Sequence, residues 1–146
     1  MSSIEAALGL SQLRKVDRLI ELRRDVAKRM REALQDIHQI ELPAEPAEIY
    51  QVYQMFTILV KPGRQVRDDL SKYLSERGIA SKVYFDPVHD YTVFRQMGLE
   101  SVELLATRDI SSRVLSLPMY PGMTDEDVET IANAIRAFFT GAINVR

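Results

Sequence analysis

Residues 115–128 read LSLPMYPGMTDEDV, a stretch that predicts a strand, a turn and the start of a helix. Pro118 cannot donate a hydrogen bond to a neighbouring strand, so it belongs at the end or edge of the strand predicted for Val114–Met119. Thr124 is a candidate helix N-cap, and the acidic residues after it lie where the helix dipole favours negative charge. The predicted helix has one apolar face, made of Val128, Ile131, Ile135, Phe138 and Phe139.

Residues 2–13 read SSIEAALGLSQL and predict the start of a long helix. Ser2 and Glu5 have the spacing of a capping box, and no proline occurs before Pro43. A helix from Ser3 to about Ile37 is ~50 Å long, whereas a domain of this size has a radius of gyration of only ~15 Å. Residues 1–37 are therefore expected to overhang the domain. The stripe expected to face the core comprises Leu13, Val16, Ile20, Ala27, Met30, Leu34 and Ile37, with Arg23 in the one missing apolar slot.

The overhanging end of this helix is apolar around much of its circumference. Its apolar residues are Ile4, Ala6, Ala7, Leu8 and Leu10. A solvated helix end does not tolerate such a surface well, so we expect another polypeptide to cover it, or self-association in its absence. The alternative is a kink at Gly9 that folds the first turn back onto the domain.

The middle of the chain predicts two strands and three shorter helical segments. Residues 50–60 alternate with the period of a strand, and residues 79–85 predict a second strand. A helix between them begins after Pro62-Gly63 and ends at Gly78. A helical turn is expected at 93–97 and a short amphipathic helix at 102–110. The fold class is therefore α+β: one domain, residues 1–146, with a small three- to four-stranded, mainly antiparallel sheet and helices on one face.

The composition is that of an ordinary globular domain. The chain has 146 residues, of which 46% are hydrophobic and 27% charged, and it contains no cysteine. A net charge of -2 makes nucleic acid an unexpected partner. No signal-like segment or membrane-spanning run is evident, so no membrane association is expected and the cytoplasm is the expected location.

A basic run in the first helix allows two interpretations. Its members are Arg14, Lys15, Arg18, Arg23, Arg24, Lys28, Arg29 and Arg31. Such a run could bind phosphates or a membrane surface. Acidic residues interleave with it at spacings of three and four, however, which favours a solvated face with local ion pairs.

The two quoted stretches, in this order, resemble the C-terminal third of the DegT/DnrJ/EryC1/StrS aminotransferases, which use pyridoxal phosphate to aminate nucleotide-linked keto-sugars. The resemblance covers the chain from Met1 to about Phe139 and implies the small domain of those enzymes. Gly78-Ile79, Pro87 and His89 also match a family element that commonly reads His-Tyr-Pro-Pro-Leu-His after a Gly-Ile pair. Here Tyr84, Phe85 and Asp86 replace the first three residues of that element.

The resemblance implies that His89, Tyr84 and Tyr120 contact substrate. Other interpretations remain open: His89 as a surface residue that caps a turn, and Tyr120 as a packing residue near a domain interface. Asp86, His89 and Asp90 could also form a metal cluster, but such groupings arise often by chance, and no metal site is predicted.

The resemblance implies no catalytic residue and no cofactor-binding residue in this chain. Pyridoxal phosphate needs a lysine amine and an acid that pairs with its pyridine nitrogen. None of the lysines, Lys15, Lys28, Lys61, Lys72 and Lys82, has the surroundings typical of the family's cofactor lysine.

The predicted function is therefore the C-terminal domain of a nucleotide-sugar aminotransferase that is inactive alone. The partners implied are the missing large pyridoxal phosphate domain and a second copy of the chain bound through the N-terminal helix. The alternative is a stand-alone ligand-binding or assembly module without enzymatic activity, which is suggested by fold analogy only.

Overall fold

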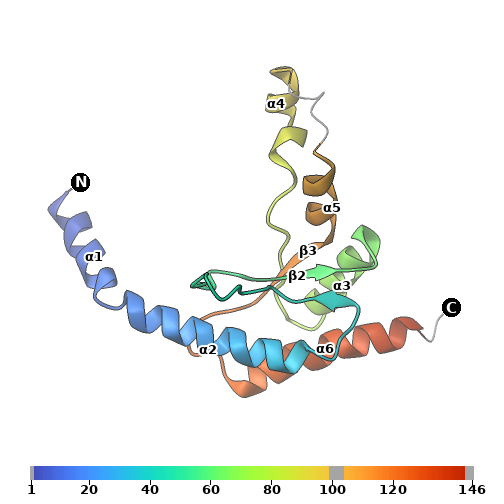
Figure 1. Ribbon diagram of the computed structural model, residues 1–146, viewed down its shortest axis with the longest axis horizontal. Coiled ribbons are helices and arrows are strands. Elements are labelled where there is room, and N and C mark those ends of the chain that lie inside the picture. Colours follow the sequence, from blue (N-terminus) through green and yellow to red (C-terminus); the bar gives the residue numbers. More distant parts are fainter. Residues whose placement is uncertain (1, 99–103, 144–146) are drawn as a thin grey trace.

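The computed structural model describes residues 2–98 and 104–143 (Figure 1). Its elements in chain order are α1 (Ser3–Leu13), α2 (Val16–Leu34), β1 (Ile40–Glu41), β2 (Phe56–Val60), α3 (Arg64–Ser75), the 3-10 turn η1 (Val88–Asp90), α4 (Thr92–Gln96), α5 (Leu105–Arg113), β3 (Val114–Leu117) and α6 (Asp125–Ile143). The α+β class is confirmed. Among the described residues, none of the helices combines the length and the apolar character needed to cross a bilayer.

The sheet has three antiparallel strands in the order β1, β2, β3. Ile40 pairs with Val60 at one edge of β2, and Phe56 pairs with Leu117 at the other. Phe56, Ile58 and Val60 are buried and alternate with half-buried residues, because successive side chains of a strand point to opposite faces. The predicted small antiparallel sheet is therefore present.

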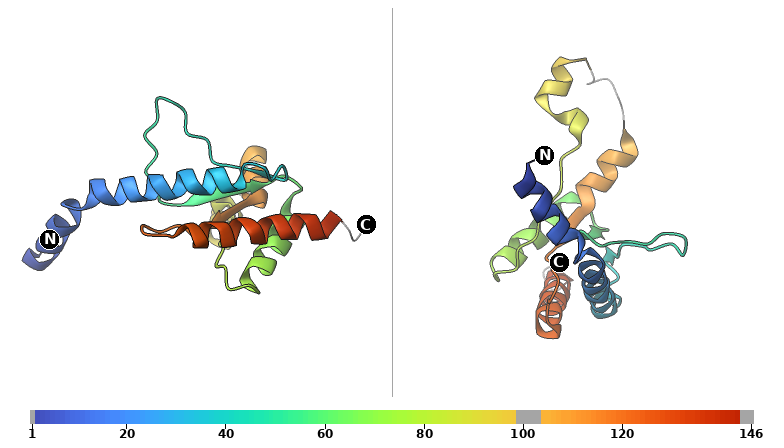
Figure 2. Two further views of the ribbon diagram at one scale, coloured as in Figure 1. Left: turned by 90° about the horizontal axis from the view of Figure 1, so that it is seen from below. Right: turned by 90° about the vertical axis from the view of Figure 1, so that its left-hand side faces the viewer.

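The core lies on one face of this sheet. Helices α2 and α6 run side by side and in the same direction beneath it (Figure 2), and α3 also contributes buried side chains. Arg29 of α2 donates to Asp125 at 2.7 Å, and Arg136 of α6 donates to Asp36 at 3.0 Å, so ion pairs flank both ends of the helix contact. The largest fully buried side chains are Phe56, Met30, Leu34, Ile58, Leu70, Leu74, Leu115, Ile135, Val26 and Val60.

The long N-terminal helix predicted as one element is two helices. The capping box is confirmed, since Ser2 N donates to Glu5 Oε2 at 2.6 Å and Glu5 N donates to Ser2 Oγ at 3.3 Å. The helix breaks at Arg14 and Lys15, where Lys15 N bonds the carbonyl of Gln12 instead of the residue four positions back. The alternative of a kink at Gly9 is wrong, because Gly9 lies inside α1 and no residue of α1 is buried.

The strand predicted for residues 50–60 is wrong over its first half. Only Phe56–Val60 forms a strand. Arg24 Nη1 donates to the carbonyl of Gln51 at 2.6 Å, and Arg23 Nη1 donates to the carbonyls of Tyr53 and Gln54 at 3.2 and 3.1 Å. Tyr53 also has a φ of 46°, which is incompatible with extended strand geometry. Contacts with α2 therefore replace the sheet pairing that the alternation predicts.

The strand predicted for residues 79–85 is reduced to a single bridge. Lys82 N donates to Ser116 O at 3.0 Å, and Ser116 N donates to Lys82 O at 2.8 Å. The chain reaches this bridge from a helix cap, since Ile79 N bonds Leu74 O after Gly78 adopts a φ of 74°. Only Lys82 therefore touches the free edge of β3.

The remaining helices follow the sequence pattern. The turn predicted at 93–97 is α4, and α6 begins after Thr124 as expected, with Asp127 N donating to Thr124 Oγ1 at 3.1 Å. The helix predicted at 102–110 is α5, which begins at Leu105; residues 102–103 lie outside the described residues.

Segments η1, α4 and α5 form an arm that projects from the side of the sheet opposite α2 and α6 (Figures 1 and 2). At the base of the arm, Arg67 of α3 is only 3% exposed and donates to the carbonyls of Ser111 and Val114. Asp90 accepts hydrogen bonds from Arg95 at 3.3 Å and from Arg108 at 3.0 Å. The arm is thus held by charge pairing more than by apolar packing.

Replacing Leu70 by alanine should lower the free energy of unfolding by about 2–5 kcal/mol, because a fully buried leucine leaves a cavity in the core. The matched control, Leu105→Ala, removes a leucine that is 71% exposed and should change it by less than about 0.5 kcal/mol. Urea unfolding followed by far-UV circular dichroism measures both. Equal losses in the two variants would contradict the assignment of the core.

Candidate functional site

A cavity of about 340 Å³ lies where the end of β3 meets the segment that bridges to it. Two of the three residues predicted to contact substrate, Tyr84 and Tyr120, line this cavity. Its remaining lining residues are Gln54, Met55, Ala80, Ser81, Lys82, Ser116, Leu117, Pro118 and Met119. The cavity therefore joins three segments that are distant in sequence: 54–55, 80–84 and 116–120.

The bridge between Lys82 and Ser116 fixes the direction of the side chains on segment 80–84. In extended backbone, residues two apart point to the same side. Lys82 and Tyr84 are exposed, whereas Val83 between them is half-buried and does not line the cavity. Lys82 and Tyr84 accordingly both line the cavity, with Lys82 Nζ 5.6 Å from the centroid of the Tyr84 ring.

Tyr120 lines the cavity from the turn after β3, and Asp127 holds it in place. Its hydroxyl donates to Asp127 Oδ2 at 3.2 Å. This hydrogen bond raises the pKa of Tyr120. The pKa of Asp127 is lowered, chiefly because the backbone N–H of Thr124 donates to its carboxylate at 2.9 Å. The Tyr120 hydroxyl therefore keeps its proton, and its oxygen can accept a hydrogen bond from a ligand.

His89 does not line this cavity. It belongs to η1 at the base of the arm, and its Nε2 is buried without a hydrogen-bond partner among the described residues. A buried, unpaired imidazole nitrogen is costly, so a partner beyond the described residues would stabilise it. The neighbouring Asp90 is engaged by two arginines, and no group of three potential metal ligands occurs in residues 2–98 and 104–143.

A network on α2 holds the wall of the cavity that carries Gln54 and Met55. Arg24 pairs with Glu45 at 2.5 Å, and Glu45 also accepts hydrogen bonds from Gln51 N at 3.1 Å and from the Tyr53 hydroxyl at 2.9 Å. Arg31 donates to the same hydroxyl at 3.1 Å. The basic run is therefore not simply a solvated face, because part of it binds the loop before β2.

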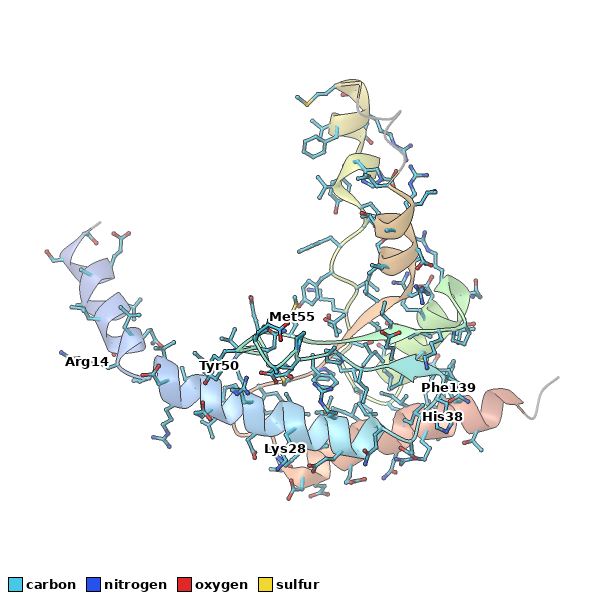
Figure 3. All side chains as sticks on the ribbon, in the orientation of Figure 1. Arg14, Lys28, His38, Tyr50, Met55 and Phe139 are labelled. Atoms are coloured by element: carbon cyan, nitrogen blue, oxygen red, sulfur yellow. The ribbon has the colours of Figure 1, made fainter. Side chains whose placement is uncertain are left out.

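This network depends on the charge of Glu45. The hydrogen bond from Arg24, assisted by those from Gln51 and Tyr53, lowers the pKa of Glu45. Figure 3 shows Tyr50 and Met55 on the side of α2 that faces the arm and Lys28 on the opposite side. Figure 2 shows that the loop held by Glu45 projects sideways from α2, in a different direction from the arm.

Comparison with known proteins identifies the family. Residues 1–136 match the DegT/DnrJ/EryC1/StrS aminotransferase family, so the chain belongs to that family. It is 30% identical to the spore coat polysaccharide biosynthesis protein SpsC of Bacillus subtilis over 97% of this chain and 38% of that protein. It is 29% identical to GDP-perosamine synthase of Vibrio cholerae, over 95% of this chain and 38% of that protein.

A solved structure shows the same fold. The pyridoxal phosphate form of the putative sugar aminotransferase Spr1654 from Streptococcus pneumoniae superposes with a TM-score of 0.84 at 21% identity, over 97% of this chain and 36% of that one. The chain thus spans little more than a third of the length of these relatives. That share fits the predicted C-terminal domain.

The described residues do not make a pyridoxal phosphate site. All five lysines are described, and two of them, Lys28 and Lys82, line cavities. Lys28 lies on the exposed face of α2, 4.0 Å from Glu32. The cavity of Lys82 has no carboxylate in its lining that could pair with a pyridine nitrogen.

Lys82 and Gln54 are among the cavity residues that sequence reasoning missed. Lys82 was considered only as a cofactor lysine, although its spacing of two from Tyr84 would place both side chains on the same face of a strand. The sequence gives no comparable indication that Gln54 lines the cavity, because its position depends on a hydrogen bond from Arg23, 31 residues earlier.

The variant Glu45→Gln should be less stable than wild type at pH 7, and the difference should shrink as the pH falls. The folded pKa of Glu45 lies below its unfolded value, so its contribution is complete above about pH 5 and is lost as the pH drops through the folded pKa. Urea unfolding at several pH values between 7 and 3 measures this.

Glu48→Gln is the matched control, because Glu48 is exposed and lies in the same loop. Its unfolding free energy should follow that of wild type at every pH. If the loss of unfolding free energy in Glu45→Gln were the same at every pH, the charge of Glu45 would not be what holds the loop.

Proposed function

We propose that this chain is the C-terminal domain of an aminotransferase acting on nucleotide-linked keto-sugars, in the formation of amino sugars for polysaccharides. It works with a larger domain that carries pyridoxal phosphate on a lysine. Family membership and the names of the relatives support the reaction class. When bound, pyridoxal phosphate supplies the amino-transfer chemistry. The residues of this chain bind and orient the sugar substrate.

The observation that carries the proposal is the exposed apolar surface of α1. Ile4 is 82% exposed, Leu8 62% and Leu13 66%, and no residue of the helix is buried. Burying a leucine or isoleucine is worth about 1.5–3 kcal/mol per side chain. A helix that is apolar around much of its circumference is typical of a buried or interface position. The missing larger domain is the natural cover.

Further apolar residues extend this surface beyond α1. Val16, Ile49, Tyr50, Val52 and Met55 are all exposed. Both α1 and the arm rise from the side of α2 that carries Tyr50 and Met55 (Figures 1 and 3). A large domain docked on this side would also close over the cavity of Tyr84 and Tyr120 and could supply a partner for His89 Nε2. The proposed role of all three residues is to contact the sugar nucleotide.

In the absence of the larger domain, the chain should self-associate through α1. Light scattering coupled to size exclusion should show a mass that rises with concentration. Leu8→Glu should weaken this association at least about tenfold, because one buried leucine side chain per copy is lost and a charge takes its place.

The control for this experiment is Ala137→Glu, which places the same charge at an exposed position of α6. It should associate like wild type. A monomer at all concentrations, or equal effects of the two substitutions, would contradict an interface made by α1.

The function itself is tested by a chimera. This chain replaces the corresponding C-terminal segment of GDP-perosamine synthase, and amino transfer to the keto-sugar nucleotide is assayed with pyridoxal phosphate. The chimera should be active, and the 146-residue chain alone should show neither turnover nor an internal-aldimine absorbance band. Tyr84→Ala in the chimera should raise KM for the sugar nucleotide about tenfold through the loss of one contact.

The Ala137→Glu chimera is the control and should retain full activity. Binding of a sugar nucleotide by the isolated chain, together with an inactive but folded and cofactor-loaded chimera, would favour the stand-alone binding module instead.

A further inference from the structure

We propose that Lys82 makes the cavity lined by Tyr84 and Tyr120 a subsite for an anionic group, a carboxylate or a phosphate, of a small-molecule substrate. The proposal rests on the proposed function for the nature of that substrate. Neither the family match nor the names of the relatives assigns a role to Lys82.

The first argument is charge. Lys82 is the only ionisable side chain apart from the two tyrosines in the described lining of this cavity. Within the described residues, it forms no ion pair. An ammonium group without an ion-pair partner leaves a local positive potential, and anions are drawn to it.

A second cavity also contains cationic side chains, but carboxylates neutralise their charge. It lies at the base of the arm, measures about 290 Å³ and is lined by Arg64, Arg95 and Arg108. Asp86 and Asp90 line the same cavity, and Asp90 accepts hydrogen bonds from two of the three arginines. Those cations already have protein partners, and the cation of Lys82 has none among the described residues.

The second argument is position. Two backbone hydrogen bonds to Ser116 fix the main chain of Lys82 against β3. The ammonium group lies 5.6 Å from the Tyr84 ring centroid, within the range of a cation–π contact. This contact restrains the side chain and uses none of its N–H donors. No oxygen atom of residues 2–98 or 104–143 accepts from this ammonium group, so its three donors can bind oxygen atoms of a ligand.

The third argument is the rest of the lining. Met55, Tyr84 and Tyr120 form much of the wall, and the Gln54 backbone is held by Arg23. The hydroxyls of Ser81 and Ser116 are each engaged in a hydrogen bond with another hydroxyl. Lys82 is thus the main group available to hold a negative charge.

Competitive lysine acetylation of the whole 146-residue chain tests the proposal. The chain is treated with a limiting acetylating reagent, and modification of each lysine is followed by peptide mass spectrometry. The probes are inorganic diphosphate, L-glutamate and thymidine, at equal ionic strength. Diphosphate or L-glutamate should slow acetylation of Lys82 about fourfold at three times its Kd, because the free fraction then falls to one quarter.

The other lysines of the same sample serve as internal controls, and Lys72, exposed on α3, is the most direct one. Its acetylation should not change. Protection by diphosphate alone identifies a phosphate subsite, and protection by L-glutamate alone identifies a carboxylate subsite. Equal protection of Lys72, protection by thymidine, or no protection at saturating probe would each overturn the proposal.

Substitution gives a second readout. Binding of the protecting anion, followed by backbone amide shifts, should weaken at least about tenfold in Lys82→Gln and stay unchanged in Lys72→Gln, because a charge-assisted contact is lost only in the first. An active chimera combined with unprotected Lys82 would contradict the anion subsite and support the proposed function. An inactive chimera combined with protected Lys82 would contradict the proposed function and support the anion subsite.

Discussion

The packing of α2 against α6 is the interaction on which the rest of the structure depends. Met30 and Leu34 of α2 and Ile135 of α6 are fully buried between the helices and the sheet. Ion pairs from Arg29 to Asp125 and from Arg136 to Asp36 fix the helices at both ends of the contact. Since α6 follows β3 by a short turn, the same contact places Tyr120 and the end of β3.

The first part of α2 has a different task, because its apolar residues do not reach this core. The buried part of α2 begins at Val26, and the residues before it bind the loop of residues 42–55 through Arg23 and Arg24. Farther towards the N-terminus, α1 has no partner within the described residues. The molecule therefore passes from a closed core to an exposed apolar surface along one pair of consecutive helices, which is where the proposed larger domain would dock.

The sequence predicted those parts of the fold that depend on local signals. The Ser2 and Thr124 caps, the turn at Gly78 and the apolar face of α6 all follow from neighbouring residues. The strand predicted for 50–60 was wrong over its first half because arginines from α2 donate hydrogen bonds to carbonyls within residues 51–54. The alternation of apolar and polar residues cannot reveal such a tertiary contact. No glycine or proline marks the helix break at Lys15 in the sequence. Of the site, Tyr84 and Tyr120 were predicted from a resemblance, whereas Lys82 was not predicted, and its bridge to Ser116 shows that its backbone lies beside β3.

The arginines that hold the framework and the lysine at the cavity differ in their chemistry. Arginines bind carbonyls and carboxylates in fixed geometry, since a planar guanidinium offers several donors at once. Arg23, Arg24 and Arg67 each bind two or more groups and so hold the framework. Lysine is a compact point charge on a flexible stem, suited to a ligand whose oxygens arrive and leave. A framework built from arginine leaves Lys82 free at the cavity, where an exchangeable anion would meet the lysine and not a guanidinium already bound to the protein.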